Sequence, residues 1–532
     1  MLTSVDFSGR PFHFIGIGGI GMSALAYVIA KRKLPVSGSD IRSSHITERL
    51  QAIGAHIFAE QQATNLEFFS SSPNSSRADA TNVQLGESAN GAAFLAASGV
   101  RGQVIGDGEE KTLTPTPYHL TPSSSTVLPQ VVCSTAINPA NSEYRAALDL
   151  GCPILHRSDL LAALIQDYYS IAVAGTHGKT TTSSMAGYVL LEAGLDPTIV
   201  VGGEVTAWGG NARLGKGKYL VAEADESDGS LVKLASEIGI ITNIELDHPD
   251  HYESLAEVID TFQIFARRCQ TTIGCIDCTT VKEHIKPAIS YSLQPEIGAD
   301  YTADCVVYRG EGTTARVWER GNILGQLNLQ LLGKHNLSNA LAVVALGRYL
   351  GLEFEAIASA CATFSGASRR FEKRGEVNGI RFIDDYAHHP SEINATLAAA
   401  KIQVNGLDFP QNRVVAIFQP HRYSRTQTFL KEFGQCFSSA DLVIVTDIYG
   451  AGEPKLNDIN GERVAQEIGL HHPQVVYQPS LKAVARFLTE NLQPGDLAIF
   501  LGAGNLNQII PEVVAFYEQT AQGMPQEYRL RA

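Results

Sequence analysis

A glycine-rich segment near the middle of the chain has the residue types needed to hold the phosphate groups of a nucleotide. Its residues are Gly175, Thr176, His177, Gly178, Lys179, Thr180 and Thr181. They follow the apolar segment 169–174 and precede a helical pattern over 180–192, the context of a phosphate-binding loop. Its glycines let backbone N–H groups face the phosphates, while Lys179 can reach the β and γ oxygens and the Thr180 hydroxyl can bind Mg²⁺. The motif is a shortened form, GxxGKT.

Two acidic groups that follow apolar segments can complete a magnesium site beside that loop. Glu223 comes directly after the predicted strand 219–222, and three more acids follow within five residues. A magnesium-bound nucleotide usually takes a carboxylate from the end of a neighbouring strand, so Glu223 is the predicted ligand. The predicted strand 238–244 leads into a second group, in which His248 stands among several acids. Because Mg²⁺ prefers oxygen ligands, His248 fits either a minor ligand role or capping and packing.

Asn336 and Asn339 stand at the start of a predicted helix over 336–350. They are three residues apart and therefore share one face of that helix. Side-chain amides can pair with both the donor and the acceptor on the edge of adenine. Helix capping is the alternative and, on the sequence alone, the commoner use of such residues.

Two loops in the last third of the chain carry histidines, acids and arginines. The predicted strand 380–384 leads into Asp384, Asp385, Tyr386, His388 and His389, and the predicted strand 414–419 leads into His421, Arg422 and Arg425. Ligands of open α/β sheets bind beyond the carboxyl ends of strands, so both loops should face one edge. Arginines in so acidic a protein suit recognition of a carboxylate; solvated surface arginines are the alternative.

The spacing GxGxxG occurs near the N-terminus, between a predicted strand over 12–17 and a helical pattern. Its residues are Gly16, Gly18, Gly19, Ile20 and Gly21, and Asp40 lies beyond the next predicted strand, 35–39. Such a loop places a diphosphate at the N-terminus of a helix, which suits NAD as well as a nucleotide sugar. The spacing alone leaves an NAD-dependent oxidoreductase open.

Three α/β domains are needed to position these residues, because strands and helices alternate along three separate stretches. We predict a Rossmann-like domain over 1–166, a central ATPase-type domain with a parallel sheet over 167–367, and a second Rossmann-like domain over 368–532. Within them we expect a polar segment at 298–304 and a helix over 426–433. Residues 70–129 are rich in small and polar residues with little periodicity, so we interpret them as an insertion.

The composition is that of an ordinary soluble enzyme and excludes several classes of protein. The 532 residues carry 41 Lys and Arg against 55 Asp and Glu, a net charge of −14, which disfavours nucleic acid and anionic membranes as partners. No segment has the length of a membrane span, and the first residues lack the features of a secretory signal. The eight cysteines are too few for a disulfide scaffold, and Cys275 and Cys278 lack the second pair that a zinc ribbon needs. We therefore expect a cytoplasmic protein.

Together, the motifs resemble those of the Mur ligase family. The matching segments are FHFIGIGGIGMSALA, GTHGKTTT, VAEADESD, NIELDHPDHY, GKHNLSNA, SGASRRFE, DDYAHHPSE and QPHRYSRT, which span the chain apart from the insertion. The resemblance implies a domain that binds a UDP-sugar, a central ATPase domain and a C-terminal domain that receives an amino acid. It places the UDP-sugar at Gly16, Gly18, Gly19, Ile20, Gly21, Asp40 and Ser134.

The family pattern also implies roles for residues of the other two domains. Lys179 and the rest of the 175–181 loop contact the ATP phosphates, while Thr180, Glu223 and His248 bind Mg²⁺. The further nucleotide contacts are Asn336, Asn339, Arg370, Asp384 and Asp385. The acceptor carboxylate and the amino acid are held by Tyr386, His388, Arg422 and Arg425, and His388 is suggested as the base for the incoming amine.

The implied reaction joins L-alanine to the lactyl carboxylate of UDP-N-acetylmuramate through an acyl phosphate, with ATP and Mg²⁺ as cofactors, as a step of peptidoglycan precursor synthesis. A recycling ligase that adds a preformed peptide to the same acceptor is the alternative within the family. Outside the family, the alternatives are an NAD-dependent oxidoreductase and a non-catalytic nucleotide-binding regulator. The expected assembly is a monomer or a homodimer.

Overall fold

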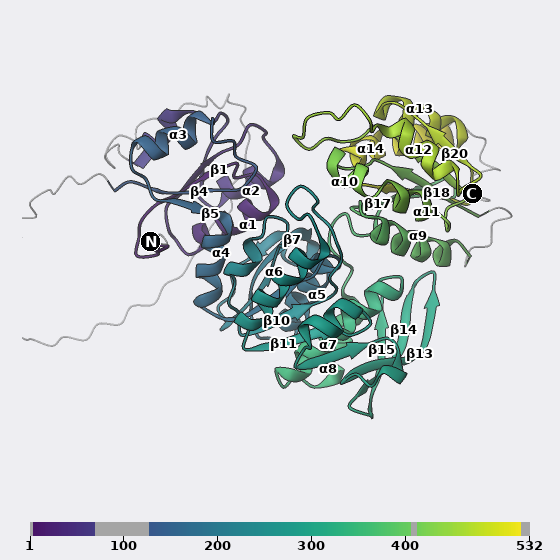
Figure 1. The fold of residues 1–532 in the computed structure, drawn as a ribbon, viewed down its shortest axis with the longest axis horizontal. Coiled ribbons are helices and arrows are strands. Elements are labelled where there is room, and N and C mark those ends of the chain that lie inside the picture. The colour runs from purple at the N-terminus through teal and green to yellow at the C-terminus, as the bar shows by residue number, and fades with distance from the viewer. Residues whose placement is uncertain (1–3, 70–126, 406–411, 523–532) are drawn as a thin grey trace, which may run out of the picture.

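The computed structural model describes residues 4–69, 127–405 and 412–522, so the expected insertion lies outside the described residues except at its end. Three α/β lobes surround a common junction, with the N-terminal and C-terminal lobes side by side and the central lobe beneath them (Figure 1). The lobes hold sheets of five, ten and six strands. The expected three-domain α/β architecture is confirmed.

The N-terminal domain is a parallel sheet with helices on its faces. The strand order is β3-β2-β1-β4-β5, and all neighbours are parallel. The elements are β1 (Phe12–Ile15), α1 (Ile20–Lys31), β2 (Val36–Ser39), α2 (His45–Ala52), β3 (His56–Phe58), β4 (Gln130–Cys133), α3 (Ser142–Asp149), β5 (Ile154–His156) and α4 (Arg157–Gln166). Strand β1 is buried along its whole length, which explains why it is apolar rather than alternating.

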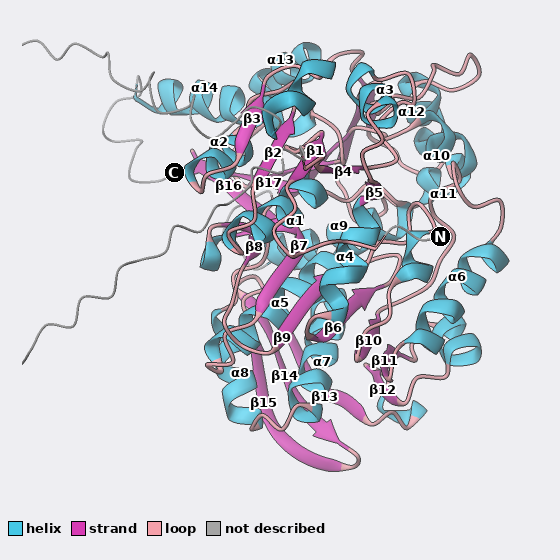
Figure 2. Ribbon diagram, turned by 90° about the vertical axis from the view of Figure 1, so that its left-hand side faces the viewer, coloured by secondary structure: helices cyan, strands magenta, loops and turns pink. Residues whose placement is uncertain are grey.

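The central domain holds the longest sheet, in the order β15-β14-β13-β12-β11-β10-β6-β9-β7-β8. Its elements are β6 (Tyr169–Ala174), α5 (Lys179–Glu192), β7 (Thr198–Val205), β8 (Gly210–Arg213), β9 (Tyr219–Glu223), β10 (Ile238–Ile241), α6 (Leu255–Arg268), β11 (Thr271–Cys275), β12 (Ile289–Ser292), β13 (Tyr301–Arg309), β14 (Gly312–Glu319), β15 (Asn322–Leu329), α7 (Lys334–Tyr349) and α8 (Phe354–Thr363). The strands from β13 to β7 pair in parallel, and β14, β15 and β8 pair antiparallel. Figure 2 shows β13, β14 and β15 extending from the foot of the sheet.

The C-terminal domain has the order β16-β17-β21-β18-β19-β20, in which only β16 is antiparallel to its neighbour. Its elements are β16 (Glu372–Val377), β17 (Ile380–Asp385), α9 (Pro390–Asn405), β18 (Arg413–Phe418), α10 (Tyr423–Thr428), α11 (Leu430–Gln435), β19 (Leu442–Val445), α12 (Gly461–Gly469), β20 (Val475–Tyr477), α13 (Leu481–Asn491), β21 (Asp496–Leu501) and α14 (Ile510–Gln522).

The structure adds a strand to one local expectation and contradicts another. The polar segment expected at 298–304 runs into strand β13, where buried Tyr301 and Ala303 alternate with polar residues because the strand has one open face. The single helix expected over 426–433 is the pair α10 and α11. They meet at Phe429, whose φ of −105° departs from helical geometry while its side chain packs into the core.

The two junctions of the central domain differ in chemistry. One hydrophobic cluster joins residues of β1 and α1, such as Phe14 and Ile29, to central residues such as Ala212 and Leu220. The C-terminal domain has two clusters of its own, and central Leu246 packs against the margin of one of them. The first two domains therefore share a core, whereas the third is joined mainly by polar contacts.

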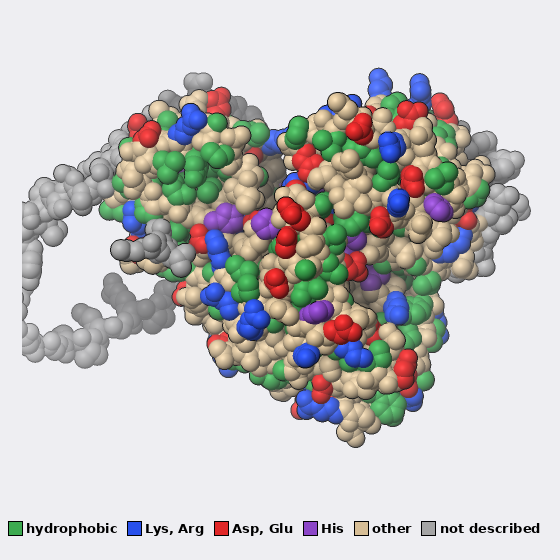
Figure 3. Space-filling view, viewed as in Figure 1, with side chains coloured by type: hydrophobic (Ala, Val, Ile, Leu, Met, Phe, Trp, Pro, Cys, Tyr) green, Lys and Arg blue, Asp and Glu red, His purple; other side chains and the backbone are tan. Residues whose placement is uncertain are grey.

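Charged side chains of both signs lie on the surface of the molecule. On the face drawn in Figure 3, acidic and basic side chains are interspersed. Among the described residues, no helix combines the length and the apolar character that crossing a membrane requires.

Candidate active site

A cavity of about 470 Å³ lies where the three domains meet, and many of the predicted site residues line it. Its walls come from the start of α1, the loop before α5, the ends of β9 and β10, and the loops before α9 and α10. The predicted residues found there are Gly19, Ile20, Gly21, Ser134, Thr176, Gly178, Lys179, Thr180, Glu223, His248, Arg370, Tyr386, His388, Arg422 and Arg425. The fold thus gathers into one space residues that are far apart in the chain.

The loop between β6 and α5 turns through two glycines with positive φ, 140° at Gly175 and 82° at Gly178. A Cβ at Gly178 would lie 2.7 Å from Oδ1 of Asn339, so glycine is needed there for space as well as for conformation. The backbone N–H of His177 donates to the side-chain oxygen of Asn243 at 2.8 Å. These contacts fix a loop that directs the N-terminus of α5 at the cavity.

The amine of Lys179 folds back across this loop. It donates to the backbone oxygens of Gly175 at 2.6 Å and Thr176 at 3.0 Å, and to Oε1 of Glu226 at 2.8 Å. Burial opposes its charge, but the carboxylates of Glu226, Asp225 and Glu223 outweigh burial and raise the pKa of Lys179. The cation is therefore maintained at the end of the loop where a phosphate would lie.

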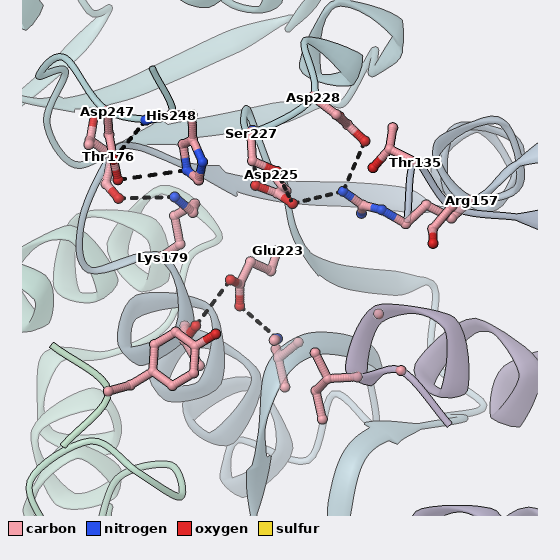
Figure 4. A pocket seen from close by; sticks show the side chains of 18 of the residues that line it. Thr135, Arg157, Thr176, Lys179, Glu223, Asp225, Ser227, Asp228, Asp247 and His248 are labelled. Carbon is pink, nitrogen blue, oxygen red and sulfur yellow. Dashed lines mark hydrogen bonds and ion pairs between the residues drawn. The ribbon is translucent and has the colours of Figure 1, made fainter. Parts of the chain in front are cut away.

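Thr180 and Glu223 supply oxygen donors that fit a magnesium ion. The Thr180 hydroxyl donates to Oε1 of Glu223 at 3.0 Å, and the N–H of Gly202 donates to Oε2 at 2.7 Å, which fixes the carboxylate. Figure 4 shows Glu223, Lys179 and His248 around the same space. Burial is the main cause of a lowered pKa at His248, so its ring is neutral and keeps a lone pair. Mg²⁺ needs few protein ligands beside phosphates and water, so this set is sufficient.

A different group, His177, Glu245 and His389, is the one trio of His, Cys, Asp or Glu among the described residues that is spaced closely enough for a metal. The ring nitrogens of His177 lie 3.4 Å from Glu245 and 3.2 Å from Glu392, within ion-pair distance but without hydrogen-bond alignment. Burial opposes its charge, yet the two carboxylates raise the pKa of His177 to about 10. A protonated imidazole has no lone pair for a metal, so we interpret the trio as an ion-paired cluster.

Arg425 forms the most deeply buried ion pair of the cavity, and it joins two domains. Its Nε donates to Oδ1 of Asp247 at 2.8 Å, and both residues are almost fully buried. Burial disfavours the charge on Asp247, but the guanidinium more than compensates and holds the pKa of that carboxyl well below its usual range. Arg422 is more exposed and lies 2.9 Å from Asp250, again across the domain boundary.

His388 is poorly suited to act as a base. Its Nδ1 lies 2.9 Å from the backbone oxygen of Tyr386, and burial together with the charge of Arg425 lowers the pKa of His388 to about 3. A ring with so low a pKa accepts a proton weakly. In this arrangement we therefore interpret His388 as a hydrogen-bonding residue.

A second cavity, of about 240 Å³, adjoins the phosphate-binding loop. Its lining includes His177, Gly178, Thr181, Asn336, Asn339, Arg370 and Asp385. Asn336 donates to the backbone oxygen of Leu332 at 2.8 Å, and Asn339 donates to Asn336 at 3.4 Å. Each amide thus donates one local hydrogen bond, while both side chains still border a space large enough for a planar base.

Asp384 does not reach either cavity. Neighbouring residues of a strand point to opposite faces, so Asp384 turns away from Asp385 and faces Arg369 at 3.4 Å. Asp385 instead accepts from the backbone N–H of Phe371 at 2.7 Å and of Ala387 at 2.8 Å. The structure therefore separates a pair that the sequence analysis groups together.

The N-terminal glycine loop divides in a similar way. Gly19, Ile20 and Gly21 line the main cavity, whereas Gly16, with φ 78°, forms the turn behind them. The N–H of Gly18 donates to Oδ2 of Asp40 at 2.9 Å, so this carboxylate supports the loop from behind.

Several ion-pair partners of the predicted residues are not evident from the sequence. Arg157, at the start of α4, lines the main cavity and lies 2.7 Å from Asp225 and 3.3 Å from Asp228 (Figure 4). Asp247 and Glu392 pair with predicted residues of another domain. A charged residue beside a predicted strand end indicates that it could belong to a site. The sequence does not show which residue it pairs with.

Comparison with known proteins identifies the family of this chain. Three family models match in order: "Mur ligase family, catalytic domain" over 11–169, "Mur ligase middle domain" over 173–347, and "Mur ligase, glutamate ligase domain" over 369–504. The chain is 64% identical to the UDP-N-acetylmuramate–L-alanine ligase of Nostoc punctiforme, over 98% of this chain and 99% of that protein. It belongs to the Mur ligase family.

Other members of the Mur ligase family agree with this result. The UDP-N-acetylmuramate–L-alanine ligase of Microcystis aeruginosa is 60% identical, over 97% of this chain and 98% of that protein. The crystal structure of the UDP-N-acetylmuramate–alanine ligase of Thermotoga maritima matches with a TM-score of 0.74 and 25% identity, covering 96% of this chain and 100% of that chain.

Proposed function

We propose that this protein joins L-alanine to the lactyl carboxylate of UDP-N-acetylmuramate and converts ATP to ADP and phosphate, a step of peptidoglycan precursor synthesis. The similarity to ligases of that name, at 60–64% identity over 97–98% of the chain, carries the proposal. The main cavity supports it, because a phosphate-binding loop, a glycine loop suited to a diphosphate and four arginines border one space.

The first step activates the acceptor. A carboxylate is a poor electrophile, so its oxygen takes the γ-phosphoryl group of ATP and ADP leaves. Lys179 neutralises charge that builds on the β and γ oxygens, and its bonds to the loop backbone keep it in place. Thr180 and Glu223, with His248 nearby, would hold a Mg²⁺ ion, which would supply positive charge beside the phosphates.

The second step forms the amide bond. The neutral amine of L-alanine attacks the carbonyl carbon of the acyl phosphate and the C–O bond to phosphate breaks. The proton that the nitrogen loses leaves with the departing phosphate. Arg425 is buried against Asp247, whereas Arg422 is about one-third exposed and pairs through Nη1 with Asp250 and Glu453. Arg422 is therefore the arginine more accessible to the carboxylate of the amino acid. Closure of the C-terminal domain over the cavity would exclude water, which hydrolyses acyl phosphates.

A steady-state assay of phosphate release with UDP-N-acetylmuramate, ATP, Mg²⁺ and a panel of alanine, glycine, serine and a preformed peptide tests the proposal. We expect turnover with alanine and a loss of roughly 10³-fold or more in Lys179→Ala. The exposed Lys431→Ala serves as the matched control and should keep full activity. Near-normal turnover in Lys179→Ala, or activity with the peptide alone, would contradict the assignment.

We also propose a cytoplasmic location. All eight cysteines are unpaired, which suits a reducing compartment. A monomer or homodimer remains our prediction for the assembly.

A further inference from the structure

An open groove of about 1320 Å³ lies between the turn that joins β13 to β14 and the C-terminal end of α9. It begins beside the nucleotide cavity, with which it shares Asn336, Arg370 and Phe371, and runs away from the phosphate-binding loop. The central and C-terminal domains each provide one wall. None of the steps proposed above uses this groove.

Arg381 is the unusual residue of this groove. It lies on β17, lines the groove and is only 8% exposed. Its Nε and Nη2 have no hydrogen-bond partner among the described residues. The acid opposite it on β16, Glu376, is engaged with Lys373 at 2.5 Å. A buried guanidinium that stays charged but unpaired is costly, so a partner from outside the described chain is called for.

The charges around the groove favour an anion. Its lining holds four cationic side chains, Arg309, Arg370, Lys373 and Arg381, against two acids, Glu311 and Glu376, an excess of two positive charges (4 − 2). The chain as a whole carries −14, so this local excess opposes the general trend. The amide of Gln403 donates to the backbone oxygen of Gly310 at 3.4 Å and ties the two walls together at one end.

We propose that this groove binds a small phosphate-bearing anion, with the guanidinium of Arg381 as its buried anchor and Arg309 and Lys373 at its rim. A planar fork of N–H donors matches phosphate oxygens in two-point contacts. Because the walls belong to two domains, the bound anion stabilises their closed arrangement and so regulates the enzyme from outside its reaction cavity. Binding of the anion to this groove does not depend on the proposed reaction.

The experiment measures inorganic phosphate binding to the full chain by calorimetry and by thermal unfolding, in wild type and in Arg381→Met. We expect the variant to bind phosphate at least tenfold more weakly. Without phosphate it should unfold at the same temperature as wild type or higher, because methionine removes an unpaired buried charge. With phosphate, the wild type should gain several degrees more than the variant, in which the phosphate-binding loop at 175–181 is intact. Arg268→Met, at the exposed end of α6, is the matched control and should behave as wild type.

Two further measurements distinguish free phosphate from a nucleotide as the ligand, and keep the proposal testable if Arg381→Met does not fold. If the groove binds free phosphate rather than the nucleotide, wild type and Arg381→Met should bind ADP with equal affinity. If the variant loses affinity for ADP as much as for phosphate, the groove is not a site separate from the nucleotide cavity. Equal phosphate binding in the two proteins, or destabilisation of the variant without phosphate, would also overturn the proposal. Should Arg381→Met fail to fold, the exposed pair Arg309→Met and Lys373→Met together should weaken phosphate binding at least threefold, and no change would refute it.

Discussion

The central domain meets its two neighbours through different chemistry. Its junction with the N-terminal domain is a continuous apolar core, in which α1 packs against β7 and β8. Its junction with the C-terminal domain is built from ion pairs such as Arg425 with Asp247 and His177 with Glu392. Apolar burial is insensitive to charge state and holds two sheets as one body, whereas ion pairs respond to pH and to ligands. From this difference we predict that the first two domains form a rigid base and that the third can move relative to it.

The largest effect should come from breaking the buried pair. Arg425→Met leaves the buried carboxylate of Asp247 without its cation, with the N–H of His248 still donating to it at 2.7 Å. We expect this to cost about 3–5 kcal/mol, or roughly 10²- to 5 × 10³-fold in the population of the closed arrangement. We expect a larger radius of gyration in X-ray scattering and a matching loss of turnover. In the double variant Arg425→Met, Asp247→Asn the radius should return toward the wild-type value even if activity does not. An unchanged radius in the single variant would show that this pair does not hold the junction.

A substitution in the apolar junction between the N-terminal and central domains should lower the free energy of unfolding without changing the positions of the domains. Ile29→Ala, fully buried in α1, should lower the free energy of unfolding by about 2–4 kcal/mol through lost packing. The N-terminal and central domains should still unfold together in calorimetry, because their core is shared. Ile468→Ala in α12, equally buried, is the control and should destabilise only the C-terminal domain. Separate transitions for the first two domains would contradict a common core.

The pH dependence of the free energy of unfolding should show which ion pairs stabilise the junction between the central and C-terminal domains. The pKa of His177 is about 10 in the fold against 6.5 in the unfolded chain, so its stabilisation is complete below pH 6.5 and is lost as pH rises toward 10. The pKa of Glu245 falls to about 2, so its share is present above about pH 4.5 and disappears on acidification. Glu392→Gln should flatten the slope of unfolding free energy between pH 6.5 and 10. Glu432→Gln, exposed on α11, should leave that slope intact, and an unchanged slope in Glu392→Gln would count against the ion-paired cluster.

The smallest effect is expected at the exposed pair. Arg422 and Asp250 are each about one-third exposed, and such pairs contribute about 0–1 kcal/mol. Asp250→Asn should therefore leave the radius of gyration and the unfolding temperature nearly unchanged. A clear opening of the molecule in this variant would show that surface charges, and not the buried pair alone, hold the third domain.

The sequence predicts best what is local. Strand 169–174 has the bounds expected from its apolar run, and the loop before α5 is recognisable because its glycines, Lys179 and Thr180 are contiguous. The antiparallel strands β14 and β15 are half exposed, so their pattern is weak and the sequence analysis does not anticipate them.

What the sequence cannot predict is pairing over distance. Asp247 and Arg425 are separated by 178 positions, and no local pattern connects them. Asp384 and Asp385 look equivalent as letters, but strand geometry sends them to opposite faces. Burial explains the rest, since the low pKa of His388 depends on neighbours that only the folded chain provides.

The contact between Asp247 and Arg425 also has a kinetic consequence. When the domains separate, each ion regains its own water shell, so hydration offsets much of the attraction that is lost. Opening and closing are then near balance, and small gains from a bound substrate suffice to tip them. We therefore expect product to leave quickly from a site that closes during the reaction.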